Sequence, residues 1–461
     1  MKKFLALLLF PFIAAAQVTV PRHSGALASN PSIPVATING STTYQVIDGF
    51  GAATAFLATV PTSVINTEYS PSQIGLKYIR VQIYPDYTDC NNVWGSCVTG
   101  PSGWTGAVIN NSDLANIQAA VANGAVLWGA MWSPPGSMKS NGNFNSGGAF
   151  IGNPTNYTNL ANIQTSFVTL MQNTYGISVY AISVQNEPDY SPPSYAGCTW
   201  TATQFHDYVP YLRSALNAAG YTSVKIMIPE SAHWSSLSGF ATTSMNDATV
   251  AADIGILGGH AYGMNGAAPP PSVPTLLSFS NVTNQHFWET ETSDQEPNGN
   301  TTYDGTMVSG LVYAQLIHQY LTIAKVNAWH YWLISGADRG ENSGLTDSSN
   351  NFAKRAYVMG NWARFATGLT EISATANPQT GVYVTAFKNL VSGKFVVVAI
   401  NTNSGSVAQN FTFAGGLSAS TVTPYITDPT HNLAAQSAIS VSGSGVNVTL
   451  TGQSVTTFVS N

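Results

Sequence analysis

Two glutamates stand at comparable places in the chain, each at the end of a short apolar run. Glu187 ends Val-Gln-Asn-Glu at 184–187 and is followed by proline, whereas Glu291 ends Phe-Trp-Glu-Thr-Glu at 287–291. Hydrolysis of a glycosidic bond with retention of configuration needs two carboxyl groups about 5 to 5.5 Å apart. One must be protonated to donate to the leaving oxygen, and the other must be ionised to attack the anomeric carbon. The two glutamates predict this chemistry, provided that both runs are strands of one small barrel.

The two carboxyl groups are expected to divide these roles according to their surroundings. Glu187 is assigned as general acid/base, held partly protonated by apolar surroundings and by the negative charge of its partner. Glu291 is assigned as nucleophile, held ionised by hydrogen-bond donors. Glu289 is a rival for the second role, because residues two apart lie on the same face of a regular strand. The spacing alone does not decide between Glu289 and Glu291.

Short β-branched runs alternate with helix-patterned stretches between residues 45 and 370, which is the rhythm of parallel βα units. A doubly wound open sheet is the alternative, but Gly-Phe-Gly at 49–51 lacks the GxGxxG spacing of its phosphate loop. The runs number eight, as a closed TIM barrel requires, and both glutamates fall at C-terminal strand ends, where barrel enzymes build their sites. The predicted strands are Ile47–Gly51, Tyr78–Ile83, Val126–Trp132, Val179–Gln185, Lys225–Ile228, Ile254–His260, His286–Thr290 and Ala328–Ile334.

The expected fold is thus α/β, a (β/α)8 barrel over residues 45–370 with a second, all-β part attached. From about residue 371 to 461 apolar residues alternate with Ser, Thr and Asn, which predicts antiparallel strands. Residues 17–44 also read as extended, so both ends are expected to share one side β-sandwich. No low-complexity linker separates the parts, which favours a sheet packed on the barrel over a flexibly attached sugar-binding module. The helices expected around the barrel include Asp113–Ala122, Tyr157–Tyr175, Ala202–Ala219 and Thr306–Ala324.

A series of motifs in one order carries a family resemblance. Ile-Asp-Gly-Phe-Gly at 47–51, Tyr-Ile-Arg at 78–80 and Trp-Ser-Pro-Pro at 132–135 come first. Asn-Glu-Pro at 186–188, His-Ala-Tyr at 260–262, Trp-Glu-Thr-Glu at 288–291 and Trp-His-Tyr-Trp at 329–332 follow. Over nearly the whole chain after residue 16, the sequence resembles glycoside hydrolase family 30, closest to its bacterial xylanase branch.

The resemblance implies roles for the residues around the two glutamates. It places the nucleophile at Glu291 and leaves Glu289 as a neighbour of it. Arg80 and Tyr262 would donate hydrogen bonds to the nucleophile, and Asn186 would hold the sugar 2-hydroxyl group. The fixed charge of an arginine suits the first role, and flat indole faces suit sugar rings. Trp132 and Trp332 would wall the sugar pocket, and the further substrate-binding candidates are His260 and Trp329.

The resemblance breaks after the eighth strand. Family members that require glucuronic acid branches on xylan carry Tyr-Ile-Arg-Arg there, and an arginine pairs with the branch carboxylate. This chain has Leu-Ile-Ser-Gly at 333–336, so Ser335 falls about where that arginine would lie, and the nearest basic residue is Arg339. Loss of a bidentate carboxylate contact removes roughly 1.5 to 3 kcal/mol. We therefore expect a xylanase without a strict need for the branch, with Ser335 and Arg339 as candidate contacts.

Composition bounds the partners and the compartment. Two lysines, an apolar run at 4–13 and three alanines before Gln17 are typical of a secretory signal, predicted to span residues 1–16. The formal net charge of −6 with 8% charged and 11% aromatic residues suits a neutral polysaccharide and disfavours nucleic acid or an anionic membrane. Three cysteines allow one disulfide, for which Cys90 and Cys97 are favoured although Cys198 could pair with either. A monomer is expected.

The sequence alone leaves two other functions open, a noncatalytic carbohydrate-binding protein and a hydrolase of another glycan. The eight histidines are scattered and none pair at ligand spacing, so neither a metal nor another cofactor is expected. A noncatalytic carbohydrate-binding protein on a hydrolase scaffold is a different class of function, against which the presence of both glutamates argues. Within the resembling family, other branches act on β-1,6-galactan or β-1,6-glucan with the same catalytic residues. The mechanism is therefore better specified by the sequence than the substrate.

Overall fold

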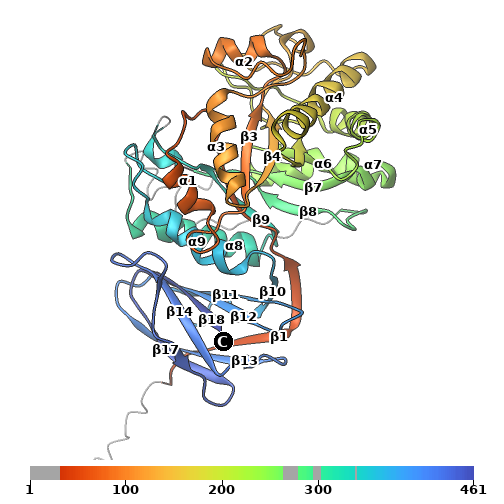
Figure 1. Ribbon diagram of the computed structural model, residues 1–461. Coiled ribbons are helices and arrows are strands. Elements are labelled where there is room, and N and C mark those ends of the chain that lie inside the picture. Colours follow the sequence, from red (N-terminus) through yellow and green to blue (C-terminus); the bar gives the residue numbers. More distant parts are fainter. Residues whose placement is uncertain (1–31, 263–278, 294–302, 338–339) are drawn as a thin grey trace, which may run out of the picture. The chain divides into compact units, whose positions relative to one another are not determined.

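Eight parallel strands close into a barrel in chain order (Figure 1). The computed structural model describes residues 32–262, 279–293, 303–337 and 340–461. All eight predicted strands are present, with ends that differ by up to three residues, so the predicted barrel is confirmed. The barrel strands are β2 (Gly49–Ala53), β3 (Tyr78–Ile83), β4 (Val126–Met131), β5 (Val179–Ser183), β6 (Lys225–Ser231), β7 (Ile254–Gly259), β8 (His286–Glu289) and β9 (Ala328–Leu333).

Helices surround the barrel and begin where the sequence supplies caps. The Asn110 side chain accepts from the backbone N–H of Asp113 at 2.8 Å, and Thr201 forms a capping box with Gln204 at the start of α5. The helices in the described residues are α1 (Thr62–Tyr69), α2 (Tyr87–Trp94), α3 (Asn111–Ala122), α4 (Pro154–Thr169), α5 (Ala202–Ala218), α6 (Leu237–Asn246), α7 (Ala248–Asp253), α8 (Met307–Thr322) and α9 (Lys354–Ala366). A π-helical turn, η2 (Leu170–Thr174), extends α4, and 3-10 turns are η1 (Gly136–Met138), η3 (Trp234–Ser236) and η5 (Glu341–Ser343).

The second sheet unites both ends of the described chain, as predicted. Strand β1 (Val35–Val46) pairs in parallel with β13 and antiparallel with β10. The other strands of this sheet are β10 (Thr370–Ala374), β11 (Val382–Lys388), β12 (Phe395–Asn401), β13 (Val407–Ala414), β14 (Thr421–Thr427), β15 (Ala434–Ala435), β16 (Ile439–Ser440), β17 (Gly445–Leu450) and β18 (Ser454–Ser460). Along β17 and the first half of β1, buried and exposed residues alternate, so one face of each strand packs into the core and the other faces solvent.

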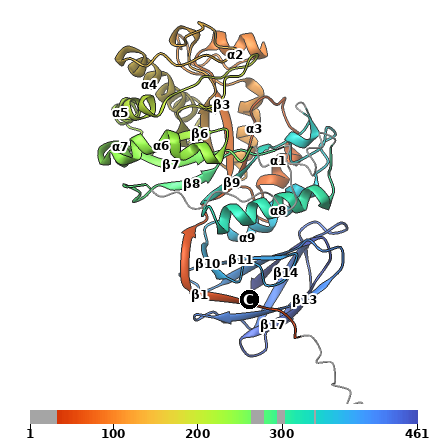
Figure 2. The ribbon, with the colours of Figure 1, turned by 180° about the vertical axis from the view of Figure 1, so that it is seen from behind.

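Helices α8 and α9 carry the contacts between the barrel and the sheet, and both views show them side by side there (Figures 1 and 2). Asn361 on α9 donates to the Thr457 hydroxyl at 2.9 Å, and the Trp362 indole donates to Thr385 at 3.0 Å. These buried bonds satisfy polar groups that packing removes from water. Residues 34–461 consequently form a single compact unit.

The structure also shows which cysteines are bonded and whether any described helix could span a membrane. Cys90 at α2 is bonded to Cys97, which confirms the predicted disulfide, and Cys198 is a buried free thiol. Among the described helices, none is both long and apolar enough to cross a membrane.

Candidate active site

The two glutamates emerge from strand ends at the same mouth of the barrel. Glu187 follows β5 and has a left-handed backbone, with φ of 49°, and its N–H donates to the Glu230 carbonyl at 2.9 Å. Glu291 follows β8, and its carbonyl accepts from the N–H of Ala261 at 2.9 Å. The backbone of each glutamate is therefore held at its own strand end and by a bond to the end of a neighbouring strand.

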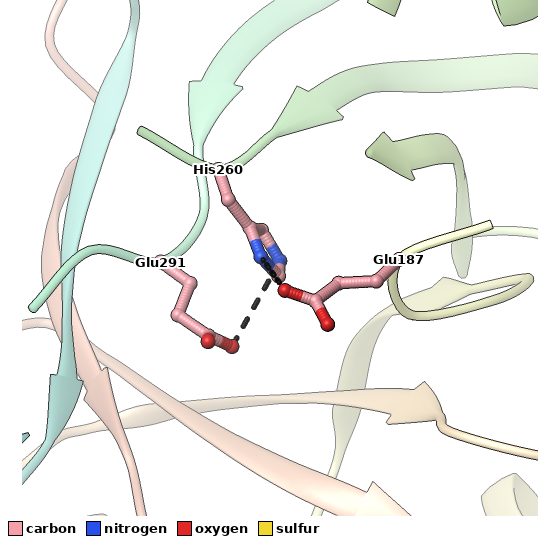
Figure 3. Close-up of side chains that lie close together, drawn as sticks. All are labelled: Glu187, His260 and Glu291. Atoms are coloured by element: carbon pink, nitrogen blue, oxygen red, sulfur yellow. Dashed lines mark hydrogen bonds and ion pairs between the residues drawn. The ribbon is translucent and has the colours of Figure 1, made fainter. Parts of the chain in front are cut away.

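The carboxyl groups of Glu187 and Glu291 point toward each other, and the ring of His260 lies between them (Figure 3). An oxygen of each carboxyl group and a ring nitrogen of His260 lie within 4.8 Å of one another. The side chains of Glu187 and Glu291 are 15% and 7% exposed, so both remain open to the cavity. Oxygens this close fit the short carboxyl separation of retaining hydrolysis better than the wider spacing that leaves room for a water between the two groups.

Glu291 is surrounded by donors. Arg80, on β3, donates through Nη1 to Oε2, and the Tyr262 hydroxyl donates to Oε1 at 2.7 Å. Burial raises the pKa of Glu291 above its ordinary value, and the positive charges of His260 and Arg80 together with the Tyr262 bond limit that rise. The donor roles that the sequence assigned to Arg80 and Tyr262 are thus present in the geometry.

Asn186 is oriented by the same arginine. Arg80 Nη2 donates to Asn186 Oδ1, so the amide hydrogens of Asn186 are left to donate. Asn186 lines the cavity beside Glu187. It can therefore donate to a sugar hydroxyl, as its predicted role requires.

His260 lies behind the cavity and does not line it, which corrects the expectation that it contacts substrate. Its Nδ1 is 3.2 Å from Glu187 Oε1, and its Nε2 is 3.8 Å from Glu291 Oε2. Burial lowers the pKa of His260, but Glu291, Glu187 and Glu230 together overcome this effect and raise it to about 10. A metal ion would need a neutral imidazole. The carboxylates around His260 favour the imidazolium instead, so this trio fits an acid/base site better than a metal site.

Glu289 is excluded as nucleophile by its position. Burial raises the pKa of Glu289 to about 8, and its side chain is fully buried. Its two oxygens accept from the backbone N–H groups of Glu291 and His330 at 3.0 and 2.9 Å. Strands β8 and β9 share the single ladder pair Trp288 and Ala328, and this carboxyl group adds a side-chain bridge between the two strands. Glu289 positions the backbone of Glu291.

The cavity has a volume of about 400 Å³ and aromatic walls. The rings of Trp132 and Trp332 lie 6.1 Å apart, and Phe56 meets Trp132 edge-on at 5.8 Å. Trp132 and Trp332 thus lie where the resemblance placed them, whereas Phe56, Tyr195 and Ser343 were not anticipated. The lining residues in the described chain are Phe56, Trp132, Asn186, Glu187, Tyr195, Tyr262, Glu291, Trp332 and Ser343.

Phe56 is held by a buried polar cluster that sequence spacing could not reveal. It has φ of 65° in the loop after β2. Thr54 at the start of this loop donates to Asp113 at 3.0 Å, and Asn116 on α3 accepts from the N–H of Val60 at 2.9 Å. The only sequence signal is the polar Asp and Asn on an otherwise buried helix face, which indicates a partner without naming it.

Two further residues expected to contact substrate, Trp329 and Ser335, do not reach the cavity, and Arg339 cannot be placed. Trp329 is fully buried with its ring against Tyr313 of α8, because alternate residues of β9 point outward while Trp332 faces the cavity. Ser335 is also fully buried, where it donates to Asn350 at 3.2 Å and accepts from Thr346 at 3.1 Å. Arg339 lies outside the described residues.

Replacing Tyr262 by Phe should lower activity and shift its pH dependence. The hydroxyl bonds the charged form of Glu291, so its removal favours the protonated form and raises the pKa of Glu291. The acid limb of the kcat/KM profile should move to higher pH by about 0.5 to 1 unit, and kcat should fall by roughly 10- to 100-fold. Initial rates on linear xylo-oligosaccharides between pH 4 and 9 measure both. An acid limb that stays in place would contradict the assigned bond.

Comparison with known proteins gives matches over the whole chain. The model of glycosyl hydrolase family 59 matches residues 118–337. A glucuronoxylanase, XynC, of Bacillus subtilis (strain 168) is 30% identical over all of this chain and 99% of its own. An endo-β-1,6-galactanase of Hypocrea rufa is 24% identical and covers 69% of this chain and 63% of its own. The solved family 30 subfamily 8 xylanase Xyn30A of Clostridium acetobutylicum is 31% identical, covers 92% of this chain and 99% of its own, and superposes with a TM-score of 0.76.

Proposed function

Because the chain belongs to glycoside hydrolase family 30, we propose that it hydrolyses xylan with retention of configuration through Glu187 and Glu291. The family 59 match spans only residues 118–337, within the barrel, whereas the xylanase relatives match the barrel and the side sheet. The observation that carries the proposal is the closeness of the two carboxyl groups, which both line the cavity and have one oxygen each within 4.8 Å of the other.

The geometry supports a double displacement. Glu291 attacks the anomeric carbon while Glu187 gives its proton to the departing glycosidic oxygen, which breaks the C–O bond and forms a glycosyl ester on Glu291. Glu187, now a carboxylate, then takes a proton from a water that attacks the same carbon and releases Glu291. Arg80, Tyr262 and the His260 imidazolium stabilise Glu291 each time it leaves as a carboxylate.

The walls of the cavity suit an uncharged sugar chain. Trp132, Trp332 and Phe56 supply flat apolar faces, and none of the described lining residues is lysine or arginine. Ser335, where an arginine would bind a glucuronic acid branch, turns into its own loop. These observations support hydrolysis of xylan without strict dependence on the branch.

A pair of tyrosines supports binding on the leaving-group side. Tyr190 and Tyr195 lie in the loop that follows Glu187, are 44% and 39% exposed, and have ring centroids 6.5 Å apart. Glu187 gives its proton toward the departing sugar, so aromatic faces on its own loop are placed to stack against that sugar. Binding of a sugar on the leaving-group side of the cleaved bond favours cleavage within a polysaccharide chain over cleavage at its end.

Product profiles test the proposed substrate. Purified protein is incubated with glucuronoxylan, unbranched xylan, β-1,6-galactan and β-1,6-glucan, with Glu291→Gln as inactive control, and products are read by mass spectrometry. We expect xylo-oligosaccharides from both xylans. Products from glucuronoxylan alone would contradict branch independence, and Arg339→Ala would then show whether this residue supplies the anchor. Products only from a β-1,6-glycan would overturn xylan as substrate and favour the activity named for the Hypocrea rufa relative.

A further inference from the structure

A third carboxylate, Glu230, contacts the two cationic side chains that border the catalytic pair. It is at the end of β6, is fully buried and does not line the cavity. Its Oε1 is 2.6 Å from Arg80 Nη2 and 3.6 Å from His260 Nε2. Glu230 thus touches the two cations that contact Glu291 and Glu187, without reaching either glutamate's reacting oxygen.

We propose that Glu230 is a positioning residue that sets the charge balance of the catalytic pair, by sharing Arg80 with Glu291 and by placing a negative charge beside His260. The inference rests on the proposed function, in which one glutamate must keep its proton and the other must lose it. Glu230 does not belong to any of the sequence motifs that carry the family resemblance.

The charges around the pair balance only when Glu230 is counted. Arg80 and His260 carry positive charges, and Glu230 and Glu291 carry negative ones. Arg80 and His260 overcome the effect of burial and lower the pKa of Glu230, which keeps it ionised. Glu289 is largely protonated at neutral pH. The cluster is therefore neutral when Glu187 holds its proton, which is the state that the first step needs.

The remaining groups near Glu230 do not replace its charge. His330 faces the same interior from β9, but burial lowers its pKa to about 3 and it stays neutral. Tyr262 is half-buried at the cavity wall, and desolvation together with the neighbouring carboxylates raises its pKa, so it adds no charge. Without Glu230, the pKa of His260 is still raised by Glu291 and Glu187, so His260 and Arg80 would leave the cluster with an extra positive charge. That charge favours the carboxylate forms of both catalytic residues. The general acid would then lose its proton at lower pH.

Glu230→Gln isolates the charge, because the amide keeps the shape of the side chain and leaves the backbone bond to Glu187 in place. On linear xylohexaose, both limbs of the kcat/KM profile should move to lower pH by about one unit. Glu230→Asp keeps the charge and should restore the limbs toward wild type, although it fits the space less well. A packing role would rank the variants in the opposite order. Glu68→Gln is the matched control, since Glu68 is also a fully buried carboxyl group, on α1, and should leave the profile unchanged.

A measurement on the unmodified protein keeps the proposal testable if Glu230→Gln does not fold. Imidazole nitrogen NMR, with His260 assigned by its absence in His260→Gln, should show an imidazolium that persists at pH 8. A His260 that is neutral at pH 8, or limbs that stay in place in folded Glu230→Gln, would overturn the proposal. Failure of the proposed function shows separately, as an unmodified protein that folds, has a protonated His260 and cuts none of the four glycans.

Discussion

Glu291→Gln is expected to lower kcat/KM on xylan by at least about 10⁴-fold, because the amide cannot form the glycosyl ester. The loss should lie in kcat, since the aromatic walls that bind the sugar chain remain. Initial rates on xylohexaose measure it, and circular dichroism with a melting curve confirms folding. Arg80 and His260 lose one of their carboxylate partners in this variant, so a lower melting temperature should accompany the loss.

Glu289→Gln is the matched control for this variant. Glu289 is two residues away in the same strand end and has its pKa raised to about 8, so glutamine resembles its neutral form at pH 6 to 7. Its amide can still accept from at least one of the two backbone N–H groups that Glu289 bridges. We expect less than about a 10-fold loss. A Glu291→Gln variant that keeps most of its activity, beside an inactive Glu289→Gln, would reverse the assignment.

Glu187→Ala is expected to separate the two chemical steps. On xylan, kcat/KM should fall by about 10²- to 10⁴-fold, the usual contribution of a general acid. On 2,4-dinitrophenyl β-xylobioside the first step needs no proton, so the glycosyl-enzyme should form at close to the normal rate and then accumulate. A burst of dinitrophenol followed by slow turnover is the expected time course.

Azide supplies the control for this second prediction. The anion is small enough to enter the space left by the Glu187 side chain, which borders the cavity. It should speed turnover of the dinitrophenyl substrate and give β-xylobiosyl azide, because attack on the Glu291 ester restores the original configuration. Equal losses on both substrates without azide rescue would contradict the role of Glu187, as would an α-azide product.

The barrel could be predicted because its strands carry strong local signals. Tyr78–Ile83 was placed with its correct ends, and Glu187 and Glu291 were placed together because parallel strands deliver their C-terminal ends to one face. The disulfide between Cys90 and Cys97 was favoured by closeness in sequence, which the structure confirms. In each case the signal lies within a few residues of the feature that it predicts.

The missed features depend on contacts across the barrel. Glu230 acquires its place from Arg80 on β3 and His260 after β7, which lie far from it in sequence. Phe56 reaches the cavity through a loop held by polar residues of α3. The hydrophobic periodicity and the composition of the sequence do not reveal these contacts, because the contacts form only when the barrel closes.

Trp329 is a different kind of error. The alternation of a strand was available from the sequence, and it places Trp329 and Trp332, which are three residues apart, on opposite faces. Treating Trp-His-Tyr-Trp as one aromatic group ignored this alternation. Ser335 was assigned by position alone, although a serine beside Gly336 is more often part of a turn.

Trapping with 2,4-dinitrophenyl 2-deoxy-2-fluoro-β-xylobioside tests the central claim most directly. The fluorine slows both steps and the good leaving group favours the first, so a retaining enzyme accumulates its glycosyl ester. We predict an increase in intact mass of one 2-deoxy-2-fluoroxylobiosyl group, and a labelled peptide in which Glu291 carries it. A label on Glu289 or Glu187, or an active enzyme that never becomes labelled, would contradict the account.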